Sequence, residues 1–178
     1  LGEQRARSPM VSEVEPRRGL FWRQRRHDLQ QLVVVGFAFK PGALENEEIG
    51  GAALGLGDYA LAKGVAYSQD RKPFGKPIGS YQALQHRMAL AKAELEAARL
   101  MTYDAADRFD NGEDAGAHAN MAKLLASRAA VAAVEAALQT HGGYGFDRDY
   151  DVITLWPMIR LLEIAPINNE MLLNYIGE

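Results

Sequence analysis

The sequence predicts an all-α protein, an antiparallel helical bundle with an irregular N-terminal segment. Three long stretches, about 44–70, 81–109 and 115–141, carry small or apolar residues at helical spacing, and short joints separate them. Two shorter helices follow at about 151–164 and 166–176. Helices of this length with short joints between them favour antiparallel neighbours, and the bundle is predicted for that reason.

The segment before the helices differs in composition from the rest of the chain. Seven arginines, no lysine and four acidic residues in 1–31 give a local charge of +3, whereas the whole chain carries −3. We interpret 1–43 as an irregular basic segment, either disordered or the remnant of a preceding β-domain, and 44–178 as the bundle. A single buried strand is predicted at 32–40. Two aromatic residues among the arginines leave open a nucleic-acid arm, but the net charge gives no general case for nucleic acid.

Composition excludes several classes of protein. There is no cysteine, so the chain has no disulfide framework, thiolate nucleophile or thiolate metal site. No apolar run approaches the roughly 18 residues of a membrane span, and no secretory signal pattern opens the chain, so we expect a cytoplasmic protein. No metal site is expected, because the four histidines do not combine with carboxylates at ligand spacing: His27, His86, His118 and His141.

Glycine is frequent in the first helix. Five glycines lie in 44–70, and each weakens an isolated helix by about 1 kcal/mol relative to alanine. They are expected where another helix or a ligand approaches closely. The candidates for such contacts are Gly50, Gly51, Gly55 and Gly57, together with the alanine-rich third helix.

The second and third helices show apolar faces with steps of three and four residues. Ser80 is the expected N-cap of the second helix, and Pro166 fits the first turn of the last helix. The predicted buried faces are Tyr81, Leu84, Met88, Ala91, Leu95 and Ala98 in the second helix and Leu124, Ser127, Val131, Val134 and Leu138 in the third.

Two loops carry residues suited to bind a ligand. The segment RKPFGKPIG, 71–79, holds three cations, two prolines and two glycines just before a helix N-terminus, where charge, amide donors and the helix dipole favour phosphate. The segment QTHGGYGF, 139–146, places three glycines within four residues at a helix C-terminus, which is more than a C-cap needs. The residues alone predict an anion-binding helical bundle.

These two loops, in this order, resemble the C-terminal helical domain of the acyl-CoA dehydrogenases. The first family pattern is matched by Tyr67, Arg71, Phe74, Gly75, Lys76, Pro77, Ile78 and Gln82. The family's AKL is matched by Ala122, Lys123 and Leu124. Its Q-x-x-G-G-x-G, with the acidic–aromatic pair that follows, is matched by Gln139, Gly142, Gly143, Gly145, Asp149 and Tyr150. The match runs from about Leu44 to Tyr175.

The resemblance implies an FAD site that is shared between subunits. In this family the FAD of one subunit is held partly by the helical domain of its neighbour, which implies a homo-oligomer. By resemblance, Arg71 faces the pyrophosphate and Phe74 lies near the adenine. The other implied cofactor residues are Gly75, Gln82, Gln139, Gly142, Gly143 and Asn168, the last in place of the family's flavin-side threonine.

The implied reaction is α,β-dehydrogenation of an acyl-CoA thioester, with the β-hydride passing to flavin N5 and the electrons leaving to an electron-transferring flavoprotein. Two alternatives stay open. One is a related flavoenzyme on the same scaffold, such as an acyl-CoA oxidase or a flavin monooxygenase, and the other is a non-catalytic helical module that dimerises or binds a partner. The family's other two domains are not recognisable in 1–43, so this chain would hold at most half of a flavin site.

The residue that removes the α-proton departs from the family pattern. Counting from Gly143 places the usual glutamate at Pro166, which cannot take a proton. Some members carry the base on the first helix of the domain, 26 residues before the loop arginine, which is Glu45 here. Glu45 is therefore the candidate base and Glu163 the weaker candidate, with no competent base as the remaining case.

Overall fold

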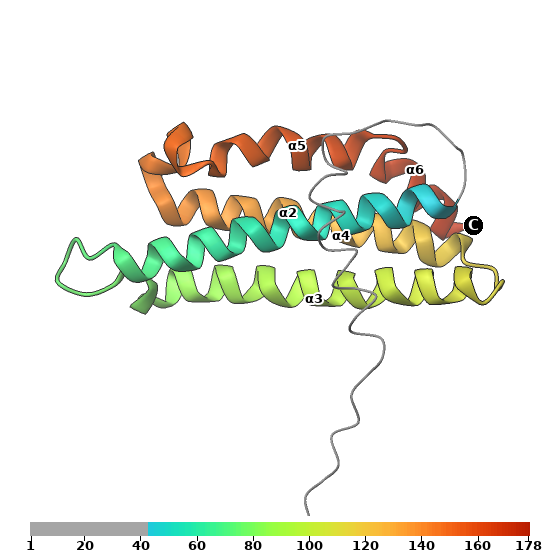
Figure 1. Ribbon diagram of the computed structural model, residues 1–178, viewed down its shortest axis with the longest axis horizontal. Helices are drawn as coiled ribbons and strands as arrows, with labels where there is room; N and C mark the ends of the chain where they lie inside the picture. The colour runs from blue at the N-terminus through green and yellow to red at the C-terminus, as the bar shows by residue number, and fades with distance from the viewer. Residues whose placement is uncertain (1–42) are drawn as a thin grey trace, which may run out of the picture. The chain divides into compact units, whose positions relative to one another are not determined.

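The computed structural model describes residues 43–178 of the protein. These residues form the predicted all-α antiparallel bundle, whereas the strand predicted at 32–40 and the basic segment lie outside the described residues. None of the described helices is long and apolar enough to cross a membrane. The elements in order are α2 (Ala43–Asp70), η1 (Ile78–Ser80), α3 (Gln82–Asp110), α4 (Gly116–His141), η2 (Gly142–Phe146), η3 (Arg148–Tyr150), α5 (Val152–Ile164) and α6 (Asn169–Gly177) (Figure 1).

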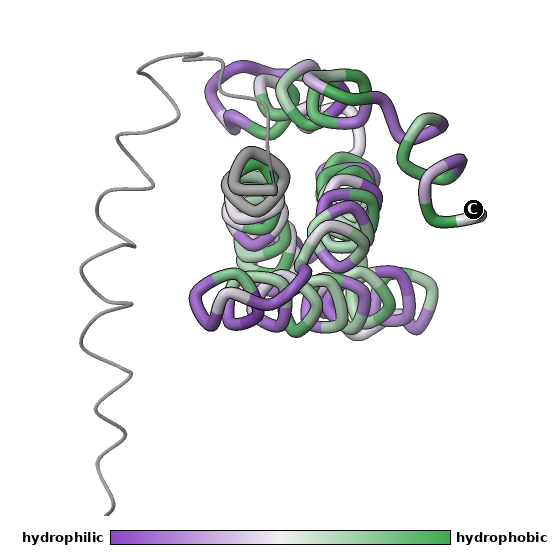
Figure 2. The backbone as a smooth tube through the Cα atoms, turned by 90° about the vertical axis from the view of Figure 1, so that its right-hand side faces the viewer, coloured by the Kyte–Doolittle hydropathy of each residue, from purple (hydrophilic) through white to green (hydrophobic). Residues whose placement is uncertain are grey.

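The direction of each helix decides which loops become neighbours. Consecutive long helices alternate in direction, so α2 and α4 run parallel to each other and antiparallel to α3 (Figure 1). The helix α3 lies along one side of the α2–α4 pair and α5 along the other (Figure 2). The segments that follow α2 and α4 therefore lie at one end of the bundle, and the start of α2 and the α5–α6 connection lie at the other (Figure 1).

The central helix of the bundle is α4. It contacts α2, α3, α5 and α6, so buried side chains surround it instead of forming one stripe. Leu124, Ser127 and Val134 of the predicted stripe are buried, and so are most of its alanines. The stripe was too narrow a prediction because alanine carries a weak hydrophobic signal, although its small side chain suits close helix packing.

The face predicted for α3 is confirmed, and its two partly exposed members lie at its N-terminal end. Tyr81 and Leu84 are half-buried. The buried members are Met88, Ala91, Leu95 and Ala98.

Glycines of α2 allow that helix to approach α4 very closely. A Cβ atom on Gly57 would lie 2.6 Å from Cδ2 of Leu95 and 3.2 Å from the backbone Cα of Ala130. Seven residues later, a Cβ atom on Gly64 would lie 3.2 Å from Cα of Ala137. The spacing of seven is nearly two helical turns, so both glycines face the same side of α2. Of the named candidates, the close approach is confirmed at Gly57, whereas no described atom lies within 4 Å of a Cβ atom on Gly51 or Gly55; Gly64 was not named as a candidate.

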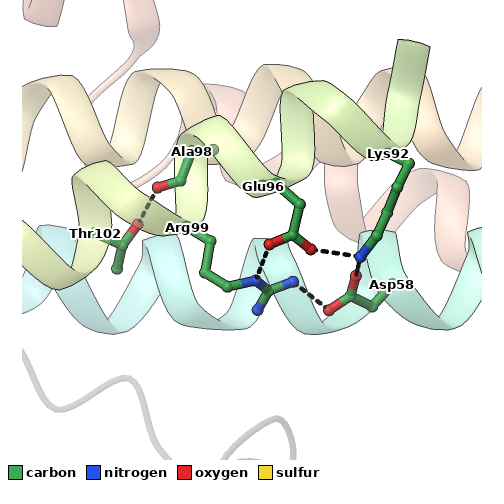
Figure 3. A network of polar contacts seen from close by, with 6 residues as sticks. All are labelled: Asp58, Lys92, Glu96, Ala98, Arg99 and Thr102. Carbon is green, nitrogen blue, oxygen red and sulfur yellow. Dashed lines mark hydrogen bonds and ion pairs between the residues drawn. The ribbon is translucent and has the colours of Figure 1, made fainter. Parts of the chain in front are cut away.

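The α2–α3 contact carries an ion network at its solvent side (Figure 3). Arg99 of α3 donates to the carboxylate of Asp58 on α2 at 2.5 Å, and Lys92 lies 3.9 Å from the same carboxylate. Glu96 pairs with both of these α3 cations. Ion pairs that are this exposed contribute little each, so we assign the bundle's stability to its apolar packing.

Two predicted helix ends are wrong. Ser80 does not cap α3, because its hydroxyl donates to the carbonyl of Pro77 at 2.8 Å and Tyr81 occupies the N-cap position. Pro166 does not lie in the first turn of α6, because that helix begins at Asn169. Asn168 is its N-cap and accepts from the amide of Met171 at 2.8 Å, which is a stronger start signal than a proline at the first turn.

Two glycine substitutions in the same helix test the close contact. Gly57→Ala should lower the free energy of unfolding by about 1 kcal/mol or more, because the overpacking of a full core outweighs the helix propensity that is gained. Gly55→Ala should raise it by about 0.5–1 kcal/mol, since nothing lies within 4 Å of a Cβ atom there. Urea unfolding of both variants measures the difference. Equal shifts for the two variants would show that Gly57 is not in close contact with Leu95 of α3 and Ala130 of α4.

Candidate functional site

The loop after α2 is closed by its own backbone. The amide of Ile78 donates to the carbonyl of Arg71 at 2.9 Å, and the amide of Gly75 donates to the carbonyl of Lys72 at 3.3 Å. Gly75 has φ of 79°, a left-handed conformation that favours glycine. The loop therefore has a fixed shape, with Arg71 directly after the last turn of α2.

The three glycines after α4 differ in what they do. Gly142 ends the helix with φ of 60°. Gly145 is buried, and a Cβ atom there would lie 2.9 Å from the carbonyl oxygen of Leu138. Around Gly142 and Gly143, nothing lies within 4 Å of an added Cβ atom. Gly145 thus closes the turn against α4, while Gly142 and Gly143 leave the backbone open to a ligand.

The two loops line one depression of about 510 Å³. Arg71 comes from the first loop, and Gln139, Gly142 and Gly143 come from the end of α4. The structure therefore brings together residues that are about 70 positions apart in the sequence, because α2 and α4 are parallel. The remaining lining residues are Tyr67, Pro73, Ile78, Thr140, His141, Tyr144 and Asp147.

A cluster of aromatic rings lies at and beside the depression. The rings of Tyr67 and His141 are stacked with centroids 4.2 Å apart, and Tyr150 meets both of them edge-on. Burial raises the pKa of Tyr67, against the opposing effect of Arg71. The guanidinium carbon of Arg71 lies 5.9 Å from the ring centroid of Tyr144. The positive charge is thus presented at the depression beside flat, partly exposed rings.

Sequence reasoning did not find this aromatic cluster. Tyr67 and Tyr150 were noted only as parts of a pattern, and His141 only as a histidine without metal-ligand spacing. Its Nδ1 lies 2.8 Å from the carbonyl oxygen of Ala137 and donates to it, which satisfies the ring inside the helix end. The usable signal was the number of aromatic residues close to the ends of two parallel helices.

Four of the eight sequence-predicted cofactor residues lie outside the depression, and one of them, Asn168, lies at the other end of the bundle. Phe74 is 80% exposed at the tip of the first loop. Gly75 and Gln82 are also exposed and do not line it. Their predicted contacts, which fall at the adenine end of the cofactor, remain predictions.

The predicted cofactor residue Asn168 and the candidate base Glu45 belong to the opposite end of the bundle. Asn168 lies in the α5–α6 connection as the N-cap of α6, and Glu45 lies in the first turn of α2 at the same end (Figure 1). Lys123 of α4 marks this end, because its ammonium donates to the carbonyl of Ile167 in the connection. Gln139 follows Lys123 by sixteen residues, or about 24 Å along the helix. A single chain therefore does not bring the two groups of residues together.

Glu163 forms an ion pair within its own helix. Its side chain is 18% exposed and pairs with Arg160 one helical turn earlier. The carboxylate is therefore already engaged by a cation of α5. Of Glu45 the structure describes only its place in α2, so its role remains a prediction.

A buried lysine was also missed as a site residue. Lys123 is 0% exposed, and its ammonium donates to the carbonyl of Ile167 at 2.7 Å and to Oδ1 of Asn169 at 2.9 Å. The sequence indicated Lys123 only as the middle residue of the AKL pattern. Its position within the buried face of an alanine-rich helix was the available signal, because lysine is almost never fully buried without partners.

Comparison with known proteins defines the class of this protein. The family model for the acyl-CoA dehydrogenase C-terminal domain matches residues 36–178. Acyl-CoA dehydrogenase FadE12 of Mycobacterium tuberculosis is 43% identical over 139 residues, which are 76% of this chain and 36% of that protein. The chain belongs to the acyl-CoA dehydrogenase family and corresponds to its C-terminal domain, as the resemblance predicted.

Other relatives show how wide the family is. The caffeyl-CoA reductase–Etf complex subunit CarC of Acetobacterium woodii is 35% identical over 72% of this chain and 35% of its own. Butyryl-CoA dehydrogenase from Megasphaera elsdenii has a similar structure, with a TM-score of 0.72 and 33% identity over 74% of this chain and 34% of its own. PigA, which was solved with FAD and proline, has a TM-score of 0.73 and 30% identity over 76% of this chain and 35% of its own. The chain thus spans about a third of the length of these relatives.

Proposed function

We propose that this chain is the cofactor-contacting C-terminal domain of an FAD-dependent acyl-CoA dehydrogenase. The observation that carries the proposal is the depression in which the Arg71 guanidinium and the open backbone of Gly142 and Gly143 face one space. Guanidinium and backbone amides are the donors that suit a pyrophosphate, and glycine without neighbours admits such a group to the backbone. PigA, with the same fold and 30% identity, was solved with FAD, which supports the choice of cofactor.

The residues present fit one side of FAD. Arg71 would hold the pyrophosphate, and Gln139 and Gly143 would lie beside it, while the exposed Phe74 and Gln82 would meet the adenine end. Asp147 also lines the depression, and its carboxylate accepts from the amide of Asp149 at 3.0 Å. The loop is already closed by its own hydrogen bonds, which reduces the ordering cost of binding.

The proposed reaction is the removal of two hydrogens from an acyl-CoA thioester. When bound, FAD supplies the hydride acceptor for the β-hydrogen. The chain must supply a carboxylate that takes the α-proton, and Pro166 removes the usual source. Glu45, at the same end as the α5–α6 connection (Figure 1), is the base that we propose, because Glu163 is held by Arg160.

The division of the site implies that two chains share each cofactor. The FAD loops and the candidate base lie at opposite ends of one bundle (Figure 1), so one chain contributes Arg71 to one cofactor and Glu45 to another. A symmetric homo-oligomer satisfies both sites at once. Exposed apolar side chains on α3, α5 and α6, among them Leu100, Trp156 and Met171, are available for such contacts.

A related flavoenzyme is the second candidate, because the similar structure of PigA was solved with FAD and proline instead of an acyl-CoA. For the first candidate, an electron-transferring flavoprotein is the proposed electron acceptor, which is in keeping with the name of the caffeyl-CoA reductase–Etf complex. Reoxidation of the reduced protein by O₂ separates the candidates: a dehydrogenase reacts slowly with O₂ and an oxidase or monooxygenase reacts fast.

Replacing the loop arginine tests the cofactor site. Arg71→Ala in the complete protein should weaken FAD binding about 10- to 100-fold, which is the value of a hydrogen bond to a charged group. Arg71→Lys should recover only part of this affinity, since lysine lacks the planar fork. FAD content after dialysis measures the effect. Lys72→Ala is the matched control, because Lys72 is in the same loop but does not line the depression. Equal FAD retention in all variants would refute the assignment.

Replacing the candidate base tests the chemistry. Glu45→Gln in the FAD-loaded protein should leave acyl-CoA binding intact, seen as a perturbed flavin spectrum, and should slow flavin reduction by about 10²- to 10⁴-fold, as expected for a lost general base. Glu47→Gln and Glu48→Gln are the controls from the same helix turn and should reduce at the parental rate. If the flavin of the Glu45→Gln protein is reduced at the parental rate, Glu45 is not the base and only complements the helix dipole.

Mixing two defective variants tests whether sites are shared. Arg71→Ala and Glu45→Gln proteins, unfolded and refolded together, should form mixed dimers. In each mixed dimer, one site combines the intact Arg71 of one chain with the intact Glu45 of the other. About a quarter of all sites should then be intact if chains pair at random in a symmetric dimer. The rate of flavin reduction by the mixture measures this recovery. If both residues acted within one chain, the mixture would gain nothing over the separate variants.

A further inference from the structure

The α5–α6 connection, residues 165–168, is attached to the bundle mainly through polar contacts. Only two residues of α6 are buried, Asn169 and Leu172, and the neighbouring Ile164 and Ile167 are exposed. Apolar packing is thus too limited to fix the connection by itself. The group that meets it from the bundle is the ammonium of Lys123, which donates to the Ile167 carbonyl and to the Asn169 side chain.

The surroundings of Lys123 form a connected polar network between α4 and the start of α6. Oδ1 of Asn169 also accepts from the hydroxyl of Ser127 at 3.2 Å. No carboxylate pairs directly with the ammonium among the described residues. Glu163 and Glu170 act on it only from a distance, and they favour its charge. Hydrogen bonds to an ionised group are about twice as strong as neutral ones, so removal of the ammonium affects the connection more than it affects any other segment.

We propose that Lys123 is a positioning residue for the reaction, whose ammonium holds the α5–α6 connection in the shape that presents Asn168 and the adjacent backbone to the substrate end of the site. The inference rests on the proposed function for its catalytic consequence, but the attachment itself rests only on the described contacts. Lys123 touches neither of the two loops at the opposite end, so its effect on FAD retention is separate from that of Arg71.

The charge of Lys123 adds a readout that depends on pH. Burial lowers the pKa of Lys123 to about 8 from its ordinary value of 10.5, with Glu163 and Glu170 opposing the change. Between these two values the unfolded chain binds more protons than the folded chain. This group's contribution to the free energy of unfolding therefore rises as pH increases from 8 to 10.5. A variant without the ammonium lacks this rise.

The experiment compares Lys123→Met with the exposed control Lys92→Met, first by hydrogen exchange of the chain. Lys123→Met should speed exchange of amides in 165–172 by about 10- to 100-fold, and it should leave 126–137 of α4 unchanged. Asn169→Ala, which removes one acceptor and keeps the ammonium, is the milder variant and should give a smaller change of the same kind. Unchanged exchange in 165–172 for both variants would overturn the attachment.

The second arm uses the complete FAD-loaded protein. Lys123→Met should lower kcat while KM for acyl-CoA and FAD content stay near the parental values, and it should flatten the stability change between pH 8 and 10.5 relative to the parent. A parental kcat, or a kcat that falls only in step with FAD loss, would overturn the positioning role. If Arg71→Ala retains FAD, the proposed function fails, whereas the exchange result still decides the attachment.

Discussion

The close contact between α2 and α4 is the constraint on which the rest of the structure depends. Gly57 and Gly64 face Ala130 and Ala137 so closely that a methyl group on either glycine would press on backbone atoms. Because the two helices are parallel, this contact sets their register as well as their distance. Arg71 follows Gly64 by two turns and Gly142 follows Ala137 by little more than one, so the loops that end the two helices must meet. The depression is a consequence of that register.

The same geometry explains why the site is divided. A helix of 26 residues such as α4 separates whatever lies at its two ends by about 39 Å. The cationic loop and the open glycines use the C-terminal ends of α2 and α4, and the α5–α6 connection and the first turn of α2 use the other end. A rigid bundle cannot fold these groups onto one ligand. The proposed association with a second copy would let its two ends serve two equivalent sites.

The fold was accessible from sequence because its signals are local. Spacing of apolar residues identified the helices, and short joints gave the antiparallel order, from which the parallel pairing of α2 and α4 follows. The two glycine-rich loops could be recognised because glycine departs so far from helix propensity. The partners of Lys123 at Ile167 and Asn169 were not accessible, since they are more than forty residues away in the sequence. The caps at Tyr81 and Asn168 depend on a choice between nearby residues.

The proline at position 166 gains meaning from the connection in which it lies. The connection is held by Asn168, which caps α6, and by the buried Lys123, whose ammonium donates to the neighbouring carbonyl of Ile167. We propose that a connection held by these contacts places the substrate or cofactor, and that a carboxylate on another element takes the proton. Glu45, the proposed base, lies in the first turn of α2, and α2 and α4 are the two long helices that begin at this end of the bundle.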